Sequence, residues 1–220
     1  MADVNVSLHP MESDHHIVLV AATAACAYLL GSINFSVVAA RILGAGDLRA
    51  IGSGNAGATN LARAAGKPAA AVVLALDLGR AFAVIHGAFI MGMGDLAPAM
   101  ALPLLAGNLF PIFHRFRGGK GVAASVGIIL AISWQSMLCG GGVFLLVFAL
   151  TRRVSPASIL MCLGYPAWIW LWGGSATEMA VAGTIALIIP ITHRKNISRL
   201  LAGTEPRTGG RTAPSEGGDR

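Results

Sequence analysis

Three short stretches of the chain combine glycine with side chains that bind phosphate. The first stretch contains Gly52, Ser53, Gly54, Asn55, Gly57, Thr59, Asn60 and Arg63. Glycines allow backbone N–H groups to approach an anion closely, and an arginine can donate two parallel hydrogen bonds to phosphate oxygens. The pattern therefore predicts an anion site, and the alternative interpretation is an ordinary polar turn between two membrane spans.

The second stretch places a lysine among glycines directly before an apolar segment. It begins at Gly107 and Asn108 and continues to Gly118, Gly119, Lys120 and Gly121. Backbone donors, a helix N-terminus and an ammonium group together favour phosphate binding. The stretch is not a Walker A loop, which would need glycine at position 114 and serine or threonine at position 121. The alternative is a lysine that extends from a helix end to the membrane interface.

The third stretch is a polar, basic segment near the end of the chain. Its residues include Thr192, His193, Arg194, Lys195, Asn196, Arg199, Gly203 and Glu205. His193 and Asn196 are three positions apart and would share one face if a helix continues through them, so both could contact a ligand. Alternatively, the basic residues only anchor the last span, and the histidine is solvated.

The composition indicates the elements that must position these residues. Hydrophobic residues make up 55% and charged residues 12% of the chain, and the mean hydropathy is +0.69, whereas a soluble domain carries roughly 25% charged residues. We predict an all-α polytopic membrane protein, because the apolar runs are continuous and do not alternate as in a β-barrel. We expect seven spans, at residues 17–43, 69–91, 96–113, 122–134, 137–150, 157–172 and 179–192. The fourth and fifth could instead form one broken hairpin or re-entrant pair.

Basic residues sort onto alternate loops. They follow the first, third, fifth and seventh expected spans, and none follows the second, fourth or sixth. The positive-inside rule then predicts an external N-terminus and a cytoplasmic C-terminus. We expect a short external segment at 1–16 that is not a cleavable signal peptide, a membrane domain at 17–203 and a disordered cytoplasmic tail at 204–220. The net charge of +6 reflects this topology and gives no reason to expect a nucleic-acid partner.

Within the second expected span, Asp77 and Arg80 lie three positions apart. Charged residues at membrane depth are costly unless they compensate each other, so we expect a structural pair that faces the bundle interior. The three cysteines lie in apolar segments and imply neither a disulfide nor a metal framework.

The three stretches together resemble the PlsY-type glycerol-3-phosphate acyltransferases of bacterial inner membranes. The resemblance runs from about Tyr28 to Glu205 and rests on three motifs in order. They are Gly-Ser-Gly-Asn-x-Gly-Ala-Thr-Asn, Phe-Pro-x-Phe followed by Gly-Gly-Lys-Gly-Val-Ala, and His-Arg-x-Asn-Ile-x-Arg-Leu-Leu-x-Gly-x-Glu. This chain departs from the family pattern at Asn108, where histidine is usual, and at Ala124, where threonine is usual.

The resemblance implies transfer of a fatty acyl group from acyl-phosphate to the sn-1 hydroxyl of glycerol 3-phosphate, giving lysophosphatidic acid and phosphate. It implies no metal or other cofactor and no direct use of acyl-CoA or acyl carrier protein. The family's active-site set corresponds to Ser53, Arg63, Lys120, His193 and Asn196. The surrounding substrate and phosphate positions are Gly54, Asn55, Gly57, Thr59, Asn60, Asn108, Gly118, Gly119 and Gly121.

We expect a monomer in the cell membrane with its active site on the cytoplasmic side. As a hypothesis, Lys120 and its glycine loop bind the acyl-phosphate, while Arg63, Ser53, His193 and Asn196 hold glycerol 3-phosphate. The base is either His193 or the substrate's own phosphate. One alternative function is a phosphate or organic-anion transporter, although the polar residues gather on one side of the membrane. Another is a CDP-alcohol phosphotransferase, which would need a cluster of aspartates for metal.

Overall fold

The regular elements in the described part of the chain are all helices. The computed structural model describes residues 9–52 and 54–208, and Ser53 lies outside the described residues. The long helices are α1 (His9–Gly31), α4 (Lys67–Ile90), α5 (Ala97–Leu109), α7 (Trp134–Thr151), α8 (Val154–Leu171) and α9 (Ala176–Thr192). The shorter ones are α2 (Phe35–Ile42), η1 (Leu48–Ala50), α3 (Ala58–Ala65), η2 (Gly94–Leu96), η3 (Ile112–His114), α6 (Val122–Ile132) and α10 (Arg194–Leu201).

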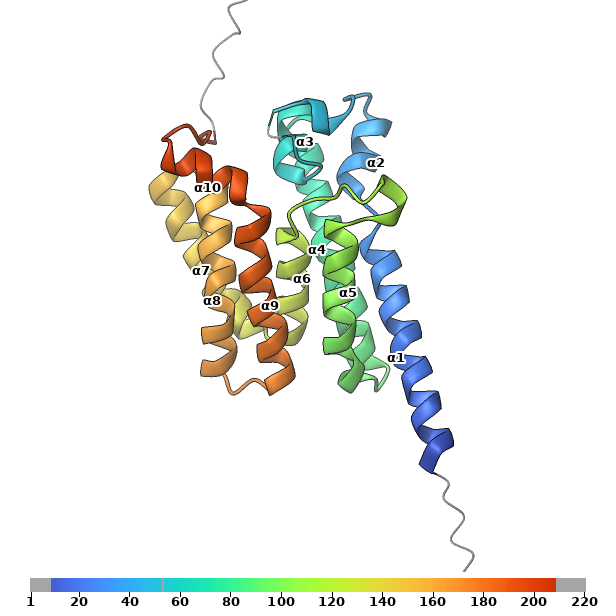
Figure 1. Cartoon of the computed structure of the whole chain (residues 1–220). Coiled ribbons are helices and arrows are strands. Elements are labelled where there is room, and N and C mark those ends of the chain that lie inside the picture. The colour runs from blue at the N-terminus through green and yellow to red at the C-terminus, as the bar shows by residue number, and fades with distance from the viewer. Residues whose placement is uncertain (1–8, 53, 209–220) are drawn as a thin grey trace, which may run out of the picture.

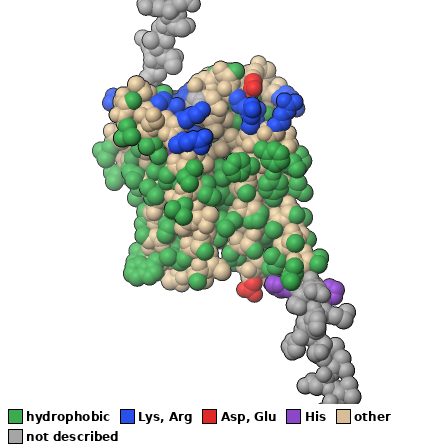
Figure 2. Space-filling view, viewed as in Figure 1, with side chains coloured by type: hydrophobic (Ala, Val, Ile, Leu, Met, Phe, Trp, Pro, Cys, Tyr) green, Lys and Arg blue, Asp and Glu red, His purple; other side chains and the backbone are tan. Residues whose placement is uncertain are grey.

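The long helices form a bundle with a distinct polar end. Figure 1 shows α2, α3 and α10 at one end of the bundle, while α1 begins at the opposite end. Figure 2 shows Lys and Arg side chains gathered at this same end, above a surface of mostly hydrophobic side chains. The basic residues that follow alternate expected spans in the sequence thus lie at one end of the bundle, as the positive-inside rule requires.

The span prediction is confirmed only in part. Five segments of the described chain are long and apolar enough to cross a bilayer, and they are His15–Ile42, Lys67–Ile90, Gly94–His114, Trp134–Thr151 and Val154–Leu171. A sixth is counted if α9 and α10, which are bent by 59° relative to each other, form one span.

The expected fourth span is shorter in the structure than the roughly 20 residues of a perpendicular span. It corresponds to α6, whose 11 residues extend about 16 Å at 1.5 Å per residue, about half the thickness of a hydrocarbon core. Only Ser133 separates α6 from α7, so the two helices form the hairpin that the sequence left open as an alternative.

The expected first span is broken into α1 and α2. Asn34 caps α2 by accepting a hydrogen bond from the N–H of Val37 (3.1 Å), and its amide donates to the carbonyl of Ala56 (3.2 Å). Arg80 of α4 donates to the carbonyl of Ile33 in the break and forms an ion pair with Asp77 (3.2 Å). Both charged side chains are buried, which confirms the predicted interior pair.

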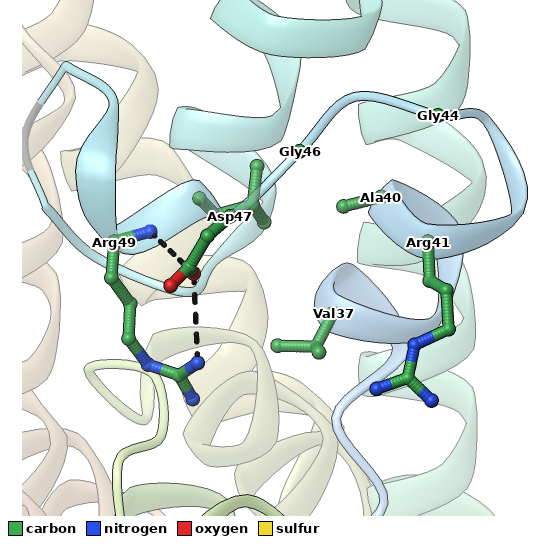
Figure 3. Close-up of a pocket in the computed structure, with 8 residues that line it drawn as sticks. Val37, Ala40, Arg41, Gly44, Gly46, Asp47 and Arg49 are labelled. Atoms are coloured by element: carbon green, nitrogen blue, oxygen red, sulfur yellow. Dashed lines mark hydrogen bonds and ion pairs between the residues drawn. The ribbon is translucent and has the colours of Figure 1, made fainter.

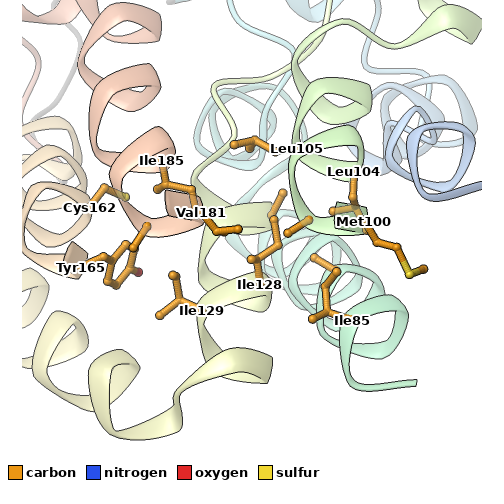
Figure 4. Close-up of a cluster of buried hydrophobic side chains, with 14 of the residues drawn as sticks. Ile85, Met100, Leu104, Leu105, Ile128, Ile129, Cys162, Tyr165, Val181 and Ile185 are labelled. Carbon is orange, nitrogen blue, oxygen red and sulfur yellow. The ribbon is translucent and has the colours of Figure 1, made fainter. Parts of the chain in front are cut away.

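The core of the bundle is built from apolar side chains of several helices. Figure 4 shows Ile85, Leu104, Ile128, Tyr165 and Ile185, contributed by α4, α5, α6, α8 and α9, gathered in this core. Glycines allow the closest helix contact elsewhere in the bundle. A Cβ built on residue 107 of α5 would lie 2.2 Å from the carbonyl oxygen of residue 28 of α1, so only glycine fits there.

Residues 204–208, which belong to the expected tail, make polar contacts with the bundle. Glu205 is buried, its side chain accepts hydrogen bonds from Ser155 and Arg199, and the N–H of Thr208 donates to the carbonyl of Arg152 (2.7 Å). Residues 204–208 are therefore held by polar contacts that compensate for the lack of apolar side chains in this segment. Residues 209–220 of the predicted tail lie outside the described residues.

Candidate active site

The three stretches singled out in the sequence meet at the polar end of the bundle. A cavity of about 180 Å³ lies there, with residues from all three stretches in its walls. The lining residues are Gly54, Asn55, Lys120, Thr192, Arg194, Lys195, Asn196 and Arg199. Four of these eight side chains are lysine or arginine, so the cavity suits an anionic ligand.

Lys120 reaches the cavity from a loop that backbone contacts hold in place. The N–H groups of Gly118 and Gly119 donate to the carbonyls of Leu109 and Asn108 (both 3.1 Å). A Cβ on residue 118 would lie 2.1 Å from the Asn108 carbonyl oxygen, so this glycine permits a close backbone approach. Gly121 follows with φ of 84° as the N-cap of α6, a left-handed conformation that favours glycine.

The loop and its lysine are also tied to α9 and α10. The hydroxyl of Thr192 donates to the carbonyl of Lys120 (3.0 Å), and the Lys120 ammonium donates to Oδ1 of Asn196 (2.5 Å). The pKa of Lys120 is lowered to about 8, mainly by burial; the charge of Glu205 opposes this shift, and the charges of Arg199 and Arg63 add to it. Lys120 is therefore a cation at neutral pH that lies near its titration range.

His193 occupies the bend between α9 and α10. Only 3% of its surface is exposed, and its Nδ1 lies 2.8 Å from the carbonyl oxygen of Ile189. A carbonyl can only accept, so Nδ1 carries the proton and Nε2 keeps its lone pair. Burial lowers the pKa of His193 to about 4, and the charge of Lys120 acts in the same direction, against the Ile189 hydrogen bond and Glu205. The ring is thus neutral at pH 7, with Nε2 as a hydrogen-bond acceptor.

Asn196 is held by a buried network that the sequence analysis missed. Its amide nitrogen donates to Glu205 Oε1 (2.6 Å) and to Ser155 Oγ (2.8 Å). Ser155 in turn donates to Glu205 Oε1 (2.5 Å), and Arg199 Nε donates to Glu205 Oε2 (2.7 Å). Burial disfavours ionisation of Glu205, but the hydrogen bonds from Ser155, Asn196 and Arg199 outweigh it and hold its pKa below the ordinary value.

The sequence indicates some members of this network better than others. Glu205 is an isolated acid in a basic segment of the third stretch, and its charge could have suggested a paired role. Ser155 lies in the first turn of α8, among small and apolar residues, and no local pattern distinguishes it. The network fixes the direction of the Asn196 amide, because both donors on Nδ2 are occupied and Oδ1 faces the lysine.

The first stretch is organised by Asn60. Its amide donates to the carbonyls of Leu48 (2.7 Å) and Ile51 (2.9 Å), and its Oδ1 accepts from Arg63 (3.4 Å). Asn60 is buried, whereas Thr59 is exposed on α3. In this structure the Asn60 amide supports the loop, together with the N–H groups of Ile51 and Gly54, which donate to the same two carbonyls (3.4 and 3.0 Å). The substrate contact expected of Asn60 stays a prediction.

Not every predicted site residue lines the cavity. Those that do are Gly54, Asn55, Lys120 and Asn196. Those placed in the surrounding loops and helix ends are Gly57, Thr59, Asn60, Arg63, Asn108, Gly118, Gly119, Gly121 and His193. Arg63 is near enough for its charge to lower the pKa of Lys120.

Four cavity residues were not assigned to the site from the sequence, and they are Thr192, Arg194, Lys195 and Arg199. The sequence alone could equally explain the three basic residues, Arg194, Lys195 and Arg199, as a membrane anchor. In the structure, α10 is bent by 59° relative to α9, and all three residues line the cavity. No cluster of three or more His, Cys, Asp or Glu side chains that could hold a metal occurs within residues 9–52 and 54–208. The groups that line the cavity are lysine and arginine side chains, the amides of Asn55 and Asn196, and the hydroxyl of Thr192.

Comparisons with known proteins agree with this chemistry. A family model described as glycerol-3-phosphate acyltransferase matches residues 21–203. The chain is 45% identical over 194 residues to a glycerol-3-phosphate acyltransferase of Dinoroseobacter shibae, covering 87% of this chain and 94% of the relative. It is 42% identical over 198 residues to one of Maricaulis maris, covering 89% and 90%.

Solved structures match over a similar length. The crystal structure of PlsY (YgiH), an integral membrane glycerol 3-phosphate acyltransferase, in its glycerol 3-phosphate form superposes with a TM-score of 0.82 at 37% identity, covering 86% of this chain and 96% of that one. The lysophosphatidic acid form gives 0.78 at 34% identity and 86% and 95% coverage. On this evidence the chain belongs to the glycerol-3-phosphate acyltransferase family.

Proposed function

We propose that this chain is an integral membrane acyltransferase that moves a fatty acyl group from acyl-phosphate to the sn-1 hydroxyl of glycerol 3-phosphate. The observation that carries the proposal is the single cavity in which Lys120, Asn196 and the basic face of α10 meet, in a chain of this family. The named relatives and both solved PlsY forms support the acceptor and the product.

The reaction needs charge and alignment more than covalent chemistry. The sn-1 hydroxyl oxygen bonds to the acyl carbon, the bond from that carbon to the phosphate oxygen breaks, and the hydroxyl proton passes to a base. Phosphate is a good leaving group, so the protein must mainly hold two phosphates close together and stabilise the charge that develops. Lys120, Arg194, Lys195 and Arg199 supply four positive groups in the cavity walls.

We assign the acyl-phosphate to Lys120 and its glycine loop, and glycerol 3-phosphate to Arg63, Ser53, His193 and Asn196. His193 Nε2 is one candidate for the base, because its lone pair is free when Nδ1 donates to Ile189. The substrate's own phosphate is the other. A serine acyl-enzyme is disfavoured, since the imidazole Nδ1 is bound to a carbonyl and not to a carboxylate.

The remaining proposals concern the membrane location, the oligomeric state and the orientation of the chain. We propose that the chain lies in the inner membrane as a monomer, with the N-terminus outside and the active site in the cytoplasm. The basic residues at the active-site end of the bundle support this orientation (Figure 2). The residues before the first span would form the external segment, and those beyond Thr208 would form the cytoplasmic tail.

The test is a direct assay of the purified protein in detergent with EDTA present. Lysophosphatidic acid is measured from glycerol 3-phosphate with acyl-phosphate and, in parallel, with acyl-CoA. We expect product from acyl-phosphate only, and loss of turnover in Lys120→Ala and His193→Ala. Lys67→Ala is the matched control, because Lys67 is exposed at the start of α4 and does not line the cavity. Near-normal turnover in Lys120→Ala would refute its assigned role.

The alternative of an anion transporter makes a different prediction. A transporter needs polar groups near the membrane midplane or along a path through the bundle, whereas here the cavity lies at one end. Phosphate flux into liposomes, without lysophosphatidic acid formation in the assay above, would favour transport over transfer.

A further inference from the structure

A second, larger cavity lies at the polar end of the bundle, apart from the candidate active site. Its volume is about 510 Å³, and none of its lining residues lines the active-site cavity. It is formed by α2 and the loop that runs into η1, with walls of Val37, Ala40, Arg41, Gly44, Gly46, Asp47, Leu48 and Arg49. Nothing in the proposed reaction uses this space.

The cavity carries two arginines on opposite sides of an apolar wall. Figure 3 shows the side chains of Arg41 and Arg49 on either side of Val37. Arg41 is exposed and forms no side-chain hydrogen bond or ion pair with any residue in the described part of the chain. A guanidinium left without a partner is available for a bidentate contact with phosphate.

Arg49 is positioned by its neighbours. Its Nη2 donates to the carbonyl of Arg117 (2.6 Å), its Nη1 lies 3.6 Å from Asp47 Oδ1, and its N–H donates to the same carboxylate (3.0 Å). Asp47 is thus compensated by Arg49, which leaves the charge of Arg41 in excess. The lining side chains therefore carry one net positive charge, which favours a ligand with a single phosphate.

Two glycines in the turn between the two arginines line the cavity without contributing side chains. Gly44 and Gly46 adopt φ of 64° and 74°, and a Cβ on either would meet nothing within 4 Å. The left-handed conformation favours glycine, and the absence of side chains leaves this wall open.

The cavity adjoins the apolar surface of the bundle. Val37, Ala40 and Leu48 line it. The neighbouring side chains of Ile42, at the end of α2, and Leu43, its C-cap, are exposed by 77% and 55%. Because α2 belongs to a segment apolar enough to cross a bilayer, these side chains fit lipid chains and not water. Arginine beside exposed apolar side chains at a membrane end matches the interface, where phosphate headgroups lie above acyl chains.

We propose that this cavity binds the phosphate headgroup of an anionic membrane phospholipid, held by Arg41 and Arg49, with the acyl chains along the exposed apolar face of α2. The occupant is a lipid and not a soluble phosphate, because the binding groups are continuous with an apolar surface. The proposal does not depend on the acyltransferase reaction, since the two cavities share no lining residue.

Arg41 is the residue to change, because Arg49 also contacts the loop of the candidate active site through Arg117. The full-length protein in a neutral detergent is titrated with dioleoyl phosphatidic acid and, separately, dioleoyl phosphatidylcholine, and bound lipid is counted by native mass spectrometry. Wild type, Arg41→Gln and Arg41→Lys are compared, with Lys67→Gln as a control that removes one exposed charge from the same end. Each is repeated with Lys120→Ala, which removes the amine of the candidate active site.

We expect Arg41→Gln to weaken binding of phosphatidic acid about tenfold, as expected for loss of one charge-assisted contact. Arg41→Lys should lose less affinity than Arg41→Gln, because the charge remains although the bidentate contact is lost. Lys67→Gln should bind as wild type does, and the loss caused by Arg41→Gln should persist with Lys120→Ala.

Three results would overturn the proposal. Equal losses in Arg41→Gln and Lys67→Gln would mean that lipid responds only to overall charge. Disappearance of the Arg41 effect with Lys120→Ala would place the lipid in the active-site cavity. Displacement of phosphatidic acid by inorganic phosphate alone would show that the ligand is a soluble anion.

Discussion

Titration of Lys120 should set the alkaline limit of the acyltransferase reaction. Burial lowers the pKa of this lysine to about 8, with Arg199 and Arg63 acting in the same direction and Glu205 opposing them. Below this value the group is a cation that can bind phosphate, and above it the group is a neutral amine. Activity should therefore be present at neutral pH and fall as the pH rises through about 8.

The size of the effect follows from the protonated fraction. A group with a pKa of about 8 is about 90% protonated at pH 7 and about 10% protonated at pH 9, so kcat/KM should fall about tenfold between them. The substrate does not obscure this window, because a phosphate monoester loses its second proton near pH 6. His193 does not obscure it either, since burial and the charge of Lys120 lower its pKa to about 4.

The assay is initial-rate formation of lysophosphatidic acid between pH 6.5 and 9.5, with a blank without enzyme for spontaneous loss of acyl-phosphate. The parameter to follow is kcat/KM, because it reports ionisation of the free enzyme, whereas bound phosphate would raise the lysine pKa in the complex. Lys120→Arg is the companion variant, because an arginine stays charged throughout this range. If the Lys120→Arg variant retains activity, its kcat/KM should no longer fall as the pH rises.

Two results would refute the reasoning. A kcat/KM that stays flat to pH 9.5 in the wild type would mean that the charge of Lys120 does not limit the reaction. An unchanged alkaline limb in an active Lys120→Arg variant would assign the titration to another group.

Three further substitutions test the architecture around the site. Glu205→Ala should lower the unfolding temperature in detergent by about 10 °C, because it leaves buried polar partners uncompensated, a cost of about 3–5 kcal/mol. Glu178→Ala, which removes a half-buried capping-box residue at the start of α9, should cost much less, and equal shifts would argue against the network. Gly107→Leu should prevent recovery of folded protein, measured by size-exclusion chromatography. Gly79→Leu should be tolerated, because a Cβ at position 79 meets nothing within 4 Å. Recovery of both variants would contradict the close helix contact at Gly107. Asn108→Ala should change kcat/KM by less than about threefold, because this residue holds the lysine loop through its backbone carbonyl; a large loss would assign its side chain to the reaction.

The sequence predicted the convergence of the site well because membrane topology is a strong constraint. Each of the three stretches adjoins the end of an apolar segment, and the positive-inside rule places all three at one end of the bundle. Lys120 and Asn196 illustrate this, since 76 positions separate them and yet their side chains are 2.5 Å apart. No local pattern gives that distance, but the shared end of the bundle makes it possible.

The helix breaks were less predictable because composition hides them. The segment from α1 to α2 is apolar on both sides of the break, and only Asn34, which caps α2 and donates to Ala56, indicates that the helix stops. Ser155 shows the same limit at the site. Its contact with Asn196 depends on how α8 packs beside α9 and α10, which a one-dimensional pattern does not contain.

The buried network explains how a residue outside the cavity can control one inside it. An amide has a donor side and an acceptor side, and it can bind an ammonium only through its oxygen. In Asn196 the nitrogen is held by Glu205 and Ser155, so the oxygen must face Lys120. Glu205 also raises the pKa of that lysine through its charge, and it therefore favours the cationic form that the proposed phosphate contact requires. The acid at the end of the third motif thus sets both the orientation and the charge of the groups in the cavity, without lining the cavity itself.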